Sequence, residues 1–432
     1  MRSISTYTLK DPIKFKQQLL HWSRHFEEIA WLDSNSYNQN HSEFDALMAL
    51  GAFTAIKTDY HQAFAKLQEY QQTTKDWIFG YLSYDLKNDV EALCSTNPDG
   101  LEFPDLYFFQ PQKLFLLKGN RLEMHYLSML DEEIETDFTE ILKISLDDDL
   151  QLASGKKKAQ IQARITKEDY LKKVENMLAY IQRGDIYEAN FCQEFFAENS
   201  QIEPIEVFQK LNKISGPPFA SFLRLEEHWL LSASPERYLK KSGAKLISQP
   251  IKGTARRSEN AAEDLEIADQ LSRDPKEQSE NVMIVDLVRN DLSKIAKKGS
   301  VNVDELCKVY SFKQVHQMIS TISAEIDAGI PPVEALRATF PMGSMTGAPK
   351  ISAMKIIEEL EETKRGLYSG AVGYFMPTGD FDFNVVIRSI LYNSVKKYVS
   401  FSVGGAITAG SIAEKEYEEC LLKAAAMYQA LG

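Results

Sequence analysis

The sequence predicts an α+β fold, in which strands come in antiparallel runs that long helices interrupt. Five strand-like runs occur in the second half of the chain, several separated only by short turn-like sequences; they lie at residues 219–225, 229–232, 370–376, 383–392 and 398–403. Two long helical stretches interleave with them, one at residues 276–296 and one from Ile412 to the C-terminus. A regular alternation of strand and helix, which would favour a parallel sheet, is absent from this order.

The first half mixes short β-rich runs, at residues 77–82, 106–109 and 113–117, with helical segments. It ends in a polar stretch at residues 145–158, whose composition is typical of a solvated crossing between two regions; the stretch contains Asp147, Asp148, Asp149, Gly155, Lys156, Lys157 and Lys158. We therefore expect an N-terminal region of residues 1–150 and a second region of residues 158–432. We expect the two regions to pack together as one compact unit. A simple surface loop is the alternative interpretation of the polar stretch.

A helix is expected soon after this stretch. Thr166 and Asp169 form a capping box at its start, and Gly184 supplies a C-terminal stop. Apolar residues recur between them at helical spacing, namely Tyr170, Val174, Met177, Leu178 and Ile181. The pattern predicts an amphipathic helix that packs one face on the core.

A lone lysine, Lys252, stands between Ile251 and Gly253 directly after a strand-like run. A lysine in such surroundings can be desolvated, so that it loses its proton more easily and its amine becomes a nucleophile. A solvated lysine without a chemical role is the alternative.

Acidic residues continue the apolar faces of the two long helices. Glu277 and Glu280 fall on one face with Ile284 and Leu287. The C-terminal helix is expected to begin with a capping box of Ser411 and Glu414 and to carry an apolar stripe of Tyr417, Leu421, Ala424, Ala425 and Tyr428, beside which run Glu416, Glu419 and Lys423. If the helices approach each other, Glu280 and Glu419 can share a hard cation such as Mg²⁺; solvated charges are the alternative.

The strand predicted at residues 383–392 places Arg388 on the same side as Val386 and Ile390. A guanidinium between two β-branched residues needs a carboxylate or phosphate partner when it is buried. A salt bridge to an acid of the protein itself is the alternative.

Two glycine-containing segments are candidates for anion contacts. Residues 343–350 open a helix with Pro349 in its first turn, and such a lead can present backbone N–H groups to an anion, although the segment does not match the phosphate-loop pattern. Gly404 and Gly405 follow a strand and are equally compatible with a tight turn.

The composition narrows the functional class. The chain has 432 residues, of which 44% are hydrophobic and 26% charged, as in an ordinary globular protein. The net charge is −13, from 49 Lys and Arg against 62 Asp and Glu, which argues against nucleic acid or an anionic membrane as a partner. At about 150 residues per domain, the length allows roughly three domains.

The spacing of the cysteines and the lack of long apolar segments indicate where in the cell the protein is expected. The four cysteines, Cys94, Cys192, Cys307 and Cys420, form no C-x-x-C pair, so free thiols in a reducing compartment are expected. The N-terminus has no charged segment followed by an apolar one, and no apolar run approaches membrane-spanning length. We expect a soluble, cytoplasmic protein.

Taken together, the segments resemble the chorismate-utilising enzymes of the anthranilate synthase component I family, and most closely its aminodeoxychorismate synthase (para-aminobenzoate synthase) component I group. The matching stretches are residues 184–190, 231–237, 250–254, 280–291, 343–350 and 404–407, followed by Glu416 and Glu419. Residues 31–34 and 80–85 resemble the N-terminal part of the aminating members. The resemblance implies large β-sheets that form a sandwich core with helices packed outside.

Lys252 decides the subgroup within this resemblance. A P-I-K-G-T motif, here residues 250–254, is typical of aminodeoxychorismate synthases, whereas enzymes similar to anthranilate synthase carry alanine in place of the lysine. Water-adding relatives have a lysine base where this chain has Glu188, so its absence argues against hydroxylation. Aminating relatives usually show glutamine at that position, and arginine is common where Glu194 stands.

The resemblance also implies a site. Glu280 and Glu419 would hold Mg²⁺ against the ring carboxylate of chorismate, with Glu277 and Glu416 supporting the metal through water. The enolpyruvyl carboxylate would be held by other residues, which are Arg388, Tyr368, Lys423 and the backbone of Gly404 and Gly405. Thr254 and His316 are expected to line the pocket.

The implied reaction is the amination of chorismate to 4-amino-4-deoxychorismate. Lys252 would add to the second ring carbon while the hydroxyl on the fourth leaves, with Glu236 as general acid and later as base. Ammonia would come from a separate glutamine amidotransferase subunit, because no glutaminase domain is evident, or from free ammonium. The alternatives are anthranilate synthase component I and a non-catalytic sensor of chorismate or an aromatic amino acid.

Overall fold

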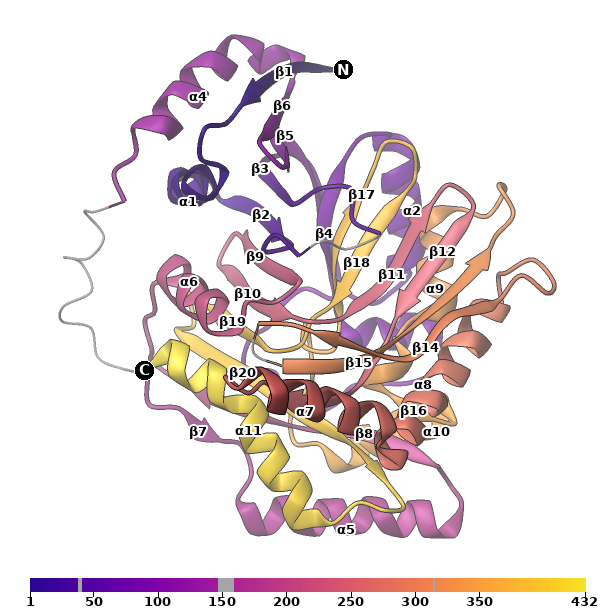
Figure 1. Cartoon of the computed structure of the whole chain (residues 1–432). Coiled ribbons are helices and arrows are strands. Elements are labelled where there is room, and N and C mark those ends of the chain that lie inside the picture. Colours follow the sequence, from indigo (N-terminus) through magenta and orange to yellow (C-terminus); the bar gives the residue numbers. More distant parts are fainter. Residues whose placement is uncertain (38–40, 147–158, 314) are drawn as a thin grey trace.

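The protein is described from a computed structural model, which covers residues 1–37, 41–146, 159–313 and 315–432 (Figure 1). All strand pairs among these residues are antiparallel, and helices lie outside them. The predicted α+β class is therefore confirmed.

The strands form two arms that meet at β5. In the first arm the spatial order is β1 (Arg2–Thr8), β6 (Arg121–Leu127), β5 (Leu106–Lys118), β3 (Ala46–Thr58), β2 (Glu28–Asp33), β9 (Phe219–Leu225), β10 (His228–Ser234), β19 (Ser389–Asn393), β20 (Tyr398–Thr408) and β8 (Glu188–Ala197). The short strands β7 (Gln162–Ala163) and β16 (Gly347–Ala348) pair with β8.

The second arm starts from the first residues of β5. Its order is β4 (Ile78–Leu82), β17 (Ala371–Phe375), β18 (Phe381–Val385), β11 (Arg237–Ser242), β12 (Lys245–Gln249) and β15 (Val315–Glu325). Strands β13 (Ile251–Arg256) and β14 (Asn302–Ser311) also pair with β15. Lys252 thus lies in β13, near the end of this arm.

Alternating residues of the first arm bury their side chains in two different cores. On β9, Leu223 and Leu225 belong to a core that also contains Phe383 of the second arm, whereas Phe222 belongs to a core shared with helices. This alternation is the expected result of the two-residue side-chain period of a strand that is covered on both faces. The arms therefore pack as a sandwich with helices outside.

The helices divide between the two cores. Those packed on the outer face of the first arm are α1 (Pro12–Trp22), α4 (Ile134–Lys143), α5 (Lys167–Arg183), α6 (Pro204–Ser215), α10 (Lys350–Leu360) and α11 (Ala413–Leu431). Those that share the core between the arms are α2 (Ala63–Thr74), α8 (Pro275–Ser293) and α9 (Pro332–Thr339). Helix α7 (Ala261–Arg273) contacts β13, β14 and β15, and short helical turns occur at α3 (Lys87–Val90), η1 (Ser23–His25), η2 (Tyr84–Leu86), η3 (Ser128–Glu133) and η5 (Gly343–Met345).

Strands of the first 146 residues pair directly with strands of the remainder. β2 pairs with β9, and β4 pairs with β17. Figure 1 accordingly shows the indigo and purple N-terminal elements lying against the orange and yellow ones. The polar stretch expected to separate two regions lies, from residue 147 to residue 158, outside the described residues.

Local sequence signals place several elements well. The Thr166 hydroxyl accepts a hydrogen bond from the backbone N–H of Asp169 at the start of α5, and Gly184 ends the helix with a left-handed φ of 83°. The strand predicted at residues 219–225 coincides with β9. Both helix ends and this strand depend on contacts between residues close in sequence.

Two predicted elements need correction. The single strand expected at residues 383–392 is two strands, β18 and β19, because the backbone turns at Arg388, where φ is 52°. Helix α11 begins at Ala413, and Ile412 is its N-cap residue. The capping box predicted for Ser411 and Glu414 is therefore not formed. Its buried stripe agrees with the prediction at Ala424 but differs at Leu421 and Tyr428, which are 40% and 37% exposed. The helix also buries Glu416, Cys420 and Met427.

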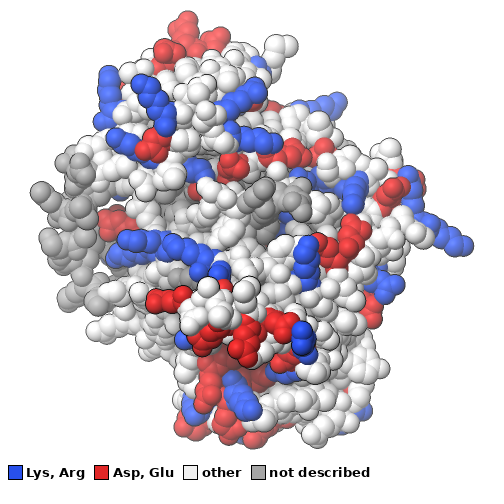
Figure 2. Space-filling model, viewed as in Figure 1, with Lys and Arg blue, Asp and Glu red and all other residues white. Residues whose placement is uncertain are grey.

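The surface agrees with the acidic composition. On the face shown in Figure 2, acidic side chains gather over α7 and below it, and Lys and Arg are dispersed among them without forming a continuous patch of the described residues. None of the described helices is long and apolar enough to span a membrane.

Candidate active site

The Lys252 side chain lies against the carboxylate of Glu188. Its Nζ is 2.9 Å from Glu188 Oε1, and the two side chains are only 11% and 3% exposed. Burial by itself lowers the pKa of Lys252, but the carboxylates of Glu188, Glu280 and Glu236 raise it by more, so the pKa is above its ordinary value. Burial thus acts on Lys252 in the direction expected from the sequence, but the buried carboxylates oppose it, and the amine forms an ion pair with Glu188.

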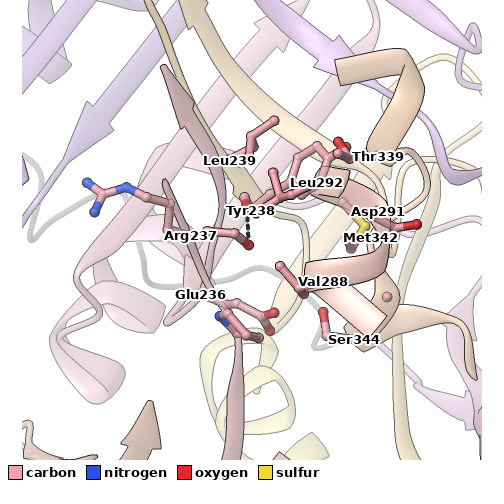
Figure 3. Close-up of a pocket in the computed structure, with 13 residues that line it drawn as sticks. Glu236, Arg237, Tyr238, Leu239, Val288, Asp291, Leu292, Thr339, Met342 and Ser344 are labelled. Carbon is pink, nitrogen blue, oxygen red and sulfur yellow. Dashed lines mark hydrogen bonds between the residues drawn. The ribbon is translucent and has the colours of Figure 1, made fainter. Parts of the chain in front are cut away.

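Glu236 stands in the short link between β10 and β11 and is 5% exposed. Burial raises the pKa of its carboxyl group to about 7, while a hydrogen bond with Ser344 and the charge of Lys252 act in the opposite direction. In Figure 3 the carboxyl group points toward Ser344, whereas the neighbouring Arg237 points away from it. A carboxyl group that titrates near neutral pH is suited to both donating and accepting a proton.

A pocket adjoins this carboxyl group. It is lined by residues of β11 and α8 and of the segments around them, including Glu236, Pro250, Val288, Thr339, Gly343 and Ser344 (Figure 3). Pro250 precedes Lys252 by two residues, so the pocket lies next to the lysine strand. Its walls bring together residues from four of the matching sequence stretches, which are residues 231–237, 250–254, 280–291 and 343–350.

Four glutamates converge from α8 and α11. The neighbouring Lys276 experiences the charges of all four, which are Glu277, Glu280, Glu416 and Glu419. Burial raises the pKa of Glu277, Glu280 and Glu416. For Glu419, burial acts in the same direction, but Lys423 lowers the pKa by more, with help from other lysines. The predicted approach of the two helices is thus present.

Glycines make room for these carboxylates. A Cβ atom at Gly405 would lie 3.2 Å from Glu416 Oε2 and 3.9 Å from Glu419 Oε1, and one at Gly253 would lie 3.1 Å from Glu277 Oε2. Either substitution would press on the acidic group. The two glycines therefore shape the space in which the carboxylates meet.

The donor set fits Mg²⁺ as a bound ion. Glu280 Oε1 is buried without a hydrogen-bond partner, and the Lys276 ammonium group faces it only at 3.7 Å, so this oxygen can still coordinate a metal ion. Among the described residues no three acidic, histidine or cysteine side chains form a ready-made metal cluster. Mg²⁺ does not require one, because it usually keeps several waters and takes one or two protein carboxylates.

Arg388 is the cation best placed for an anionic ligand. Burial lowers the pKa of its guanidinium, while Tyr368 and Glu419 act in the opposite direction. Among the ion pairs of the described residues none includes Arg388, so the predicted alternative, a salt bridge to a protein acid, is not formed there. Its positive φ is uncommon for a residue other than glycine.

Two other residues predicted to bind the same carboxylate, Tyr368 and Lys423, are engaged by the protein. Tyr368 is 4% exposed, and its hydroxyl lies 3.6 Å from Cys192 Sγ. Lys423 donates to the backbone oxygen of Gly404 at 2.9 Å and pairs with Glu419 at 2.6 Å. Its ammonium group is therefore engaged by the protein on two sides.

Gly404 and Gly405 lie inside β20, so they do not form a tight turn. They pair with Cys192 and Phe191 of β8, and a Cβ atom at Gly404 would come within 2.4 Å of Cys192 Sγ. Pairing of β20 with β19 ends at Ser400, so the opposite edge of β20 has no partner strand at the glycines within the described structure. Backbone N–H groups there are open to a ligand.

Two further predicted residues differ in their surroundings. Thr254 lies on β13 after Lys252 and is exposed. His316 is 1% exposed, and its ring nitrogens contact Ser311 Oγ at 2.8 Å and Asp264 Oδ1 at 3.0 Å. Both nitrogens are engaged, so His316 holds α7 against β15 and offers no free nitrogen to a substrate.

The loop at residues 343–350 is held mainly by the protein itself. Lys350 pairs with Asp291 at 2.5 Å and donates to the Pro341 oxygen at 2.7 Å, and burial lowers its pKa. Pro349 precedes the first residue of α10 instead of lying in its first turn. The loop contributes Ser344 to the site as the partner of Glu236.

Sequence reasoning missed a buried ion pair beneath the site. Arg365 donates to both carboxylate oxygens of Glu361. It also donates to the backbone oxygens of Asn190 and Met345, and each of these two distances is 2.7 Å. Glu361 in turn accepts from the N–H of Cys192. The pair thus connects β8 to the loop that contains Ser344. Glu361 and Arg365 lie four residues apart in a polar stretch, and such a spacing is too common to predict a buried ion pair.

Comparisons with known proteins agree with this geometry. Residues 27–429 match the family model described as chorismate binding enzyme. The chain is 36% identical over 340 residues to aminodeoxychorismate synthase component 1 of Escherichia coli, covering 79% of this chain and 73% of that one. It is 33% identical over 382 residues to anthranilate synthase component 1 of Thermus thermophilus, covering 87% and 82%.

A solved structure supports the fold. Anthranilate synthase component I from Streptococcus pneumoniae matches with a TM-score of 0.75 at 24% identity, covering 91% of this chain and 93% of that one. The family match includes strands of both arms and every segment of the site just described. The chain therefore belongs to the family of chorismate-binding enzymes.

Proposed function

We propose that the protein is an aminodeoxychorismate synthase component I, which converts chorismate and ammonia to 4-amino-4-deoxychorismate for para-aminobenzoate and folate synthesis. The observation that carries the proposal is Lys252, a buried lysine in the P-I-K-G-T motif that lies among Glu188, Glu236 and Glu280. An amine at this position is the nucleophile that separates this activity from anthranilate formation.

The substrate is a dianion, and the proposed site offers a cation for each carboxylate. Arg388, with Tyr368 and the backbone of Gly404 and Gly405, would bind the enolpyruvyl carboxylate, and Lys423 would add positive charge. Glu280 and Glu419 would hold Mg²⁺, with Glu277 and Glu416 as supports, and the bound ion would offset the charge of the ring carboxylate.

In the proposed reaction the Lys252 amine adds to the second ring carbon, and the hydroxyl on the fourth ring carbon leaves as water. Glu236 donates the proton that this departure needs, which its pKa of about 7 permits at neutral pH. Ammonia then attacks the fourth carbon, Glu236 acts as base, and Lys252 departs. Pyruvate elimination from the product would belong to another enzyme.

Ammonia would come from a separate glutamine amidotransferase subunit. The names of the relatives, component 1, support a two-component assembly. We retain the predictions of a cytoplasmic location, of no nucleic-acid or membrane partner, and of an N-terminal region that packs on the catalytic region of residues 158–432.

Product identity tests the proposal. 4-Amino-4-deoxychorismate keeps the enolpyruvyl group, whereas anthranilate has lost it as pyruvate, so mass spectrometry distinguishes the two products directly. A protein that binds chorismate and forms neither product would be a sensor.

A further inference from the structure

Glu188, the ion-pair partner of Lys252, has no role in the reaction proposed above. We infer that Glu188 is a further catalytic residue, which accepts the proton that Lys252 must lose before its amine can attack the ring. This inference rests on the proposed function, because it concerns the lysine that acts as nucleophile there.

The geometry favours Glu188 over other acids. Among the described residues, the ion-pair contact of Lys252 is with Glu188, at 2.9 Å, a hydrogen-bond distance at which a proton can be transferred directly. The backbone of Glu188 is fixed on both sides, by Thr408 of β20 and Ala348 of β16. The acceptor oxygen is therefore held in place by two neighbouring strands.

The second oxygen of this carboxylate is also informative. Glu188 is only 2% exposed, and its Oε2 atom has no hydrogen-bond partner. A carboxylate is usually satisfied at both oxygens when it is buried as a permanent ion. In Glu188 the oxygen that faces Lys252 is the one engaged by the protein.

Other charges face Lys252 from every element packed around it. They are Glu277 and Glu280 on α8, Glu236 between β10 and β11, and Glu419 on α11. These carboxylates keep the amine protonated in the substrate-free protein, and an ammonium ion has no electron pair for bond formation. The proton must therefore leave Nζ before the bond to the ring forms, and Glu188 Oε1 is the acceptor that lies within hydrogen-bond distance.

The proton and electron movements balance. The proton passes from Nζ to Glu188, and the amine forms a bond to the second ring carbon while the ring double bonds shift and the bond to the departing hydroxyl breaks. Glu236 protonates that hydroxyl, which leaves as water. When ammonia has added and the carbon–nitrogen bond to Lys252 breaks, the amine regains its proton from Glu188.

This role is specific to a carboxylate at this position. Glutamine, which aminating relatives usually carry here, accepts a hydrogen bond but cannot take up the proton. Glu194 offers a matched control on the same strand, because it is 4% exposed and pairs with Arg164 at 2.8 Å, away from Lys252.

The test compares the wild type with Glu188→Gln, Glu188→Asp and Glu194→Gln. Amination rates are measured from pH 6 to pH 10 with saturating chorismate and Mg²⁺ and a constant concentration of unprotonated ammonia. Relative to the wild type at the same pH, a comparison that cancels the titration of Glu236, we expect Glu188→Gln to be about 10²-fold slower at pH 7. This ratio should recover about tenfold per pH unit, as the lysine of the variant loses its proton to solvent. Glu188→Asp and Glu194→Gln should keep the wild-type profile shape.

Competitive acetylation of Lys252, followed by mass spectrometry of its peptide across the same pH range, provides a second readout. The pKa of Lys252 should fall in Glu188→Gln, so that a slower reaction despite a freer amine identifies Glu188 as the proton acceptor. Unchanged activity at pH 7, or an equal loss at every pH, would overturn the inference. A wild type that produces no aminated product would instead overturn the proposed function.

Discussion

Arg365 forms a bidentate ion pair with Glu361, and the two side chains are only 2% and 3% exposed. Through its other N–H groups Arg365 also binds the backbone of Asn190 and Met345. A fully buried pair of this kind is costly to break on one side, because the remaining charge is left without a partner.

We therefore expect Arg365→Met to destabilise the protein by about 3–5 kcal/mol, measured by urea unfolding. The double variant Arg365→Met, Glu361→Gln should recover part of this loss, since no unpaired charge remains. Arg183→Ala, which removes an exposed pair with Asp185, is the control and should leave the stability close to that of the wild type, because exposed ion pairs contribute little. Equal effects of Arg365→Met and Arg183→Ala would contradict the structural role of the buried pair.

Glu236 makes stability depend on pH in a defined direction. Its pKa rises from the ordinary 4.5 to about 7 on folding because of burial. Between these pH values the folded protein holds a proton that the unfolded chain has released, so this group lowers stability as pH rises and has no further effect above about pH 7.

Glu236→Gln removes this dependence. The unfolding free energy of the variant, relative to wild type, should increase by about 2–3 kcal/mol between pH 5 and pH 8. The measurement is urea unfolding at both pH values, with Glu418→Gln on the exposed side of α11 as the control. A difference between Glu236→Gln and wild type that stays constant with pH would show that the carboxyl group is not perturbed.

The acidic group of α8 and α11 predicts a metal dependence. Glu280→Gln should lose amination together with the response to added Mg²⁺, because one of the two proposed carboxylate ligands is then uncharged. Isothermal titration with Mg²⁺ in the presence of chorismate provides the measurement. Asp286→Asn, on an exposed position of the same helix, should bind Mg²⁺ as the wild type does. Full Mg²⁺-dependent activity in Glu280→Gln would remove this residue from the metal site.

The sequence predicts best those features that depend on neighbouring residues. The Thr166 cap, the Gly184 stop and strand β9 all follow from local patterns. The approach of Glu280 to Glu419 could also be anticipated, because helical spacing places the acids beside apolar positions on both helices.

Features that depend on distant parts of the chain escape such reasoning. The backbone turn at Arg388 interrupts a run that reads as one strand, and it exists because the flanking strands belong to different arms of the sheet. The protonation of Lys252 depends on Glu188, which arrives from β8, and not on the residues beside the lysine. Burial of a lysine therefore predicts a free amine only where no carboxylate is buried with it.

Lys252 is the nucleophile of the proposed reaction. Lys252→Ala should lower amination at the fourth ring carbon by about 10³-fold or divert the reaction toward anthranilate, because the nucleophile is gone. Rates and products are measured by chromatography with mass detection. Lys245→Ala, at an exposed position on β12, should keep the wild-type rate. Wild-type rate and product in Lys252→Ala would remove the lysine from the mechanism.

The central claim is tested most directly by the product that the wild-type protein forms. The purified protein is incubated with chorismate, Mg²⁺ and ammonium without any added lyase, and the product is identified by mass spectrometry and fluorescence. The proposed function predicts 4-amino-4-deoxychorismate, which retains the enolpyruvyl group. Fluorescent anthranilate, formed with release of pyruvate, would contradict it.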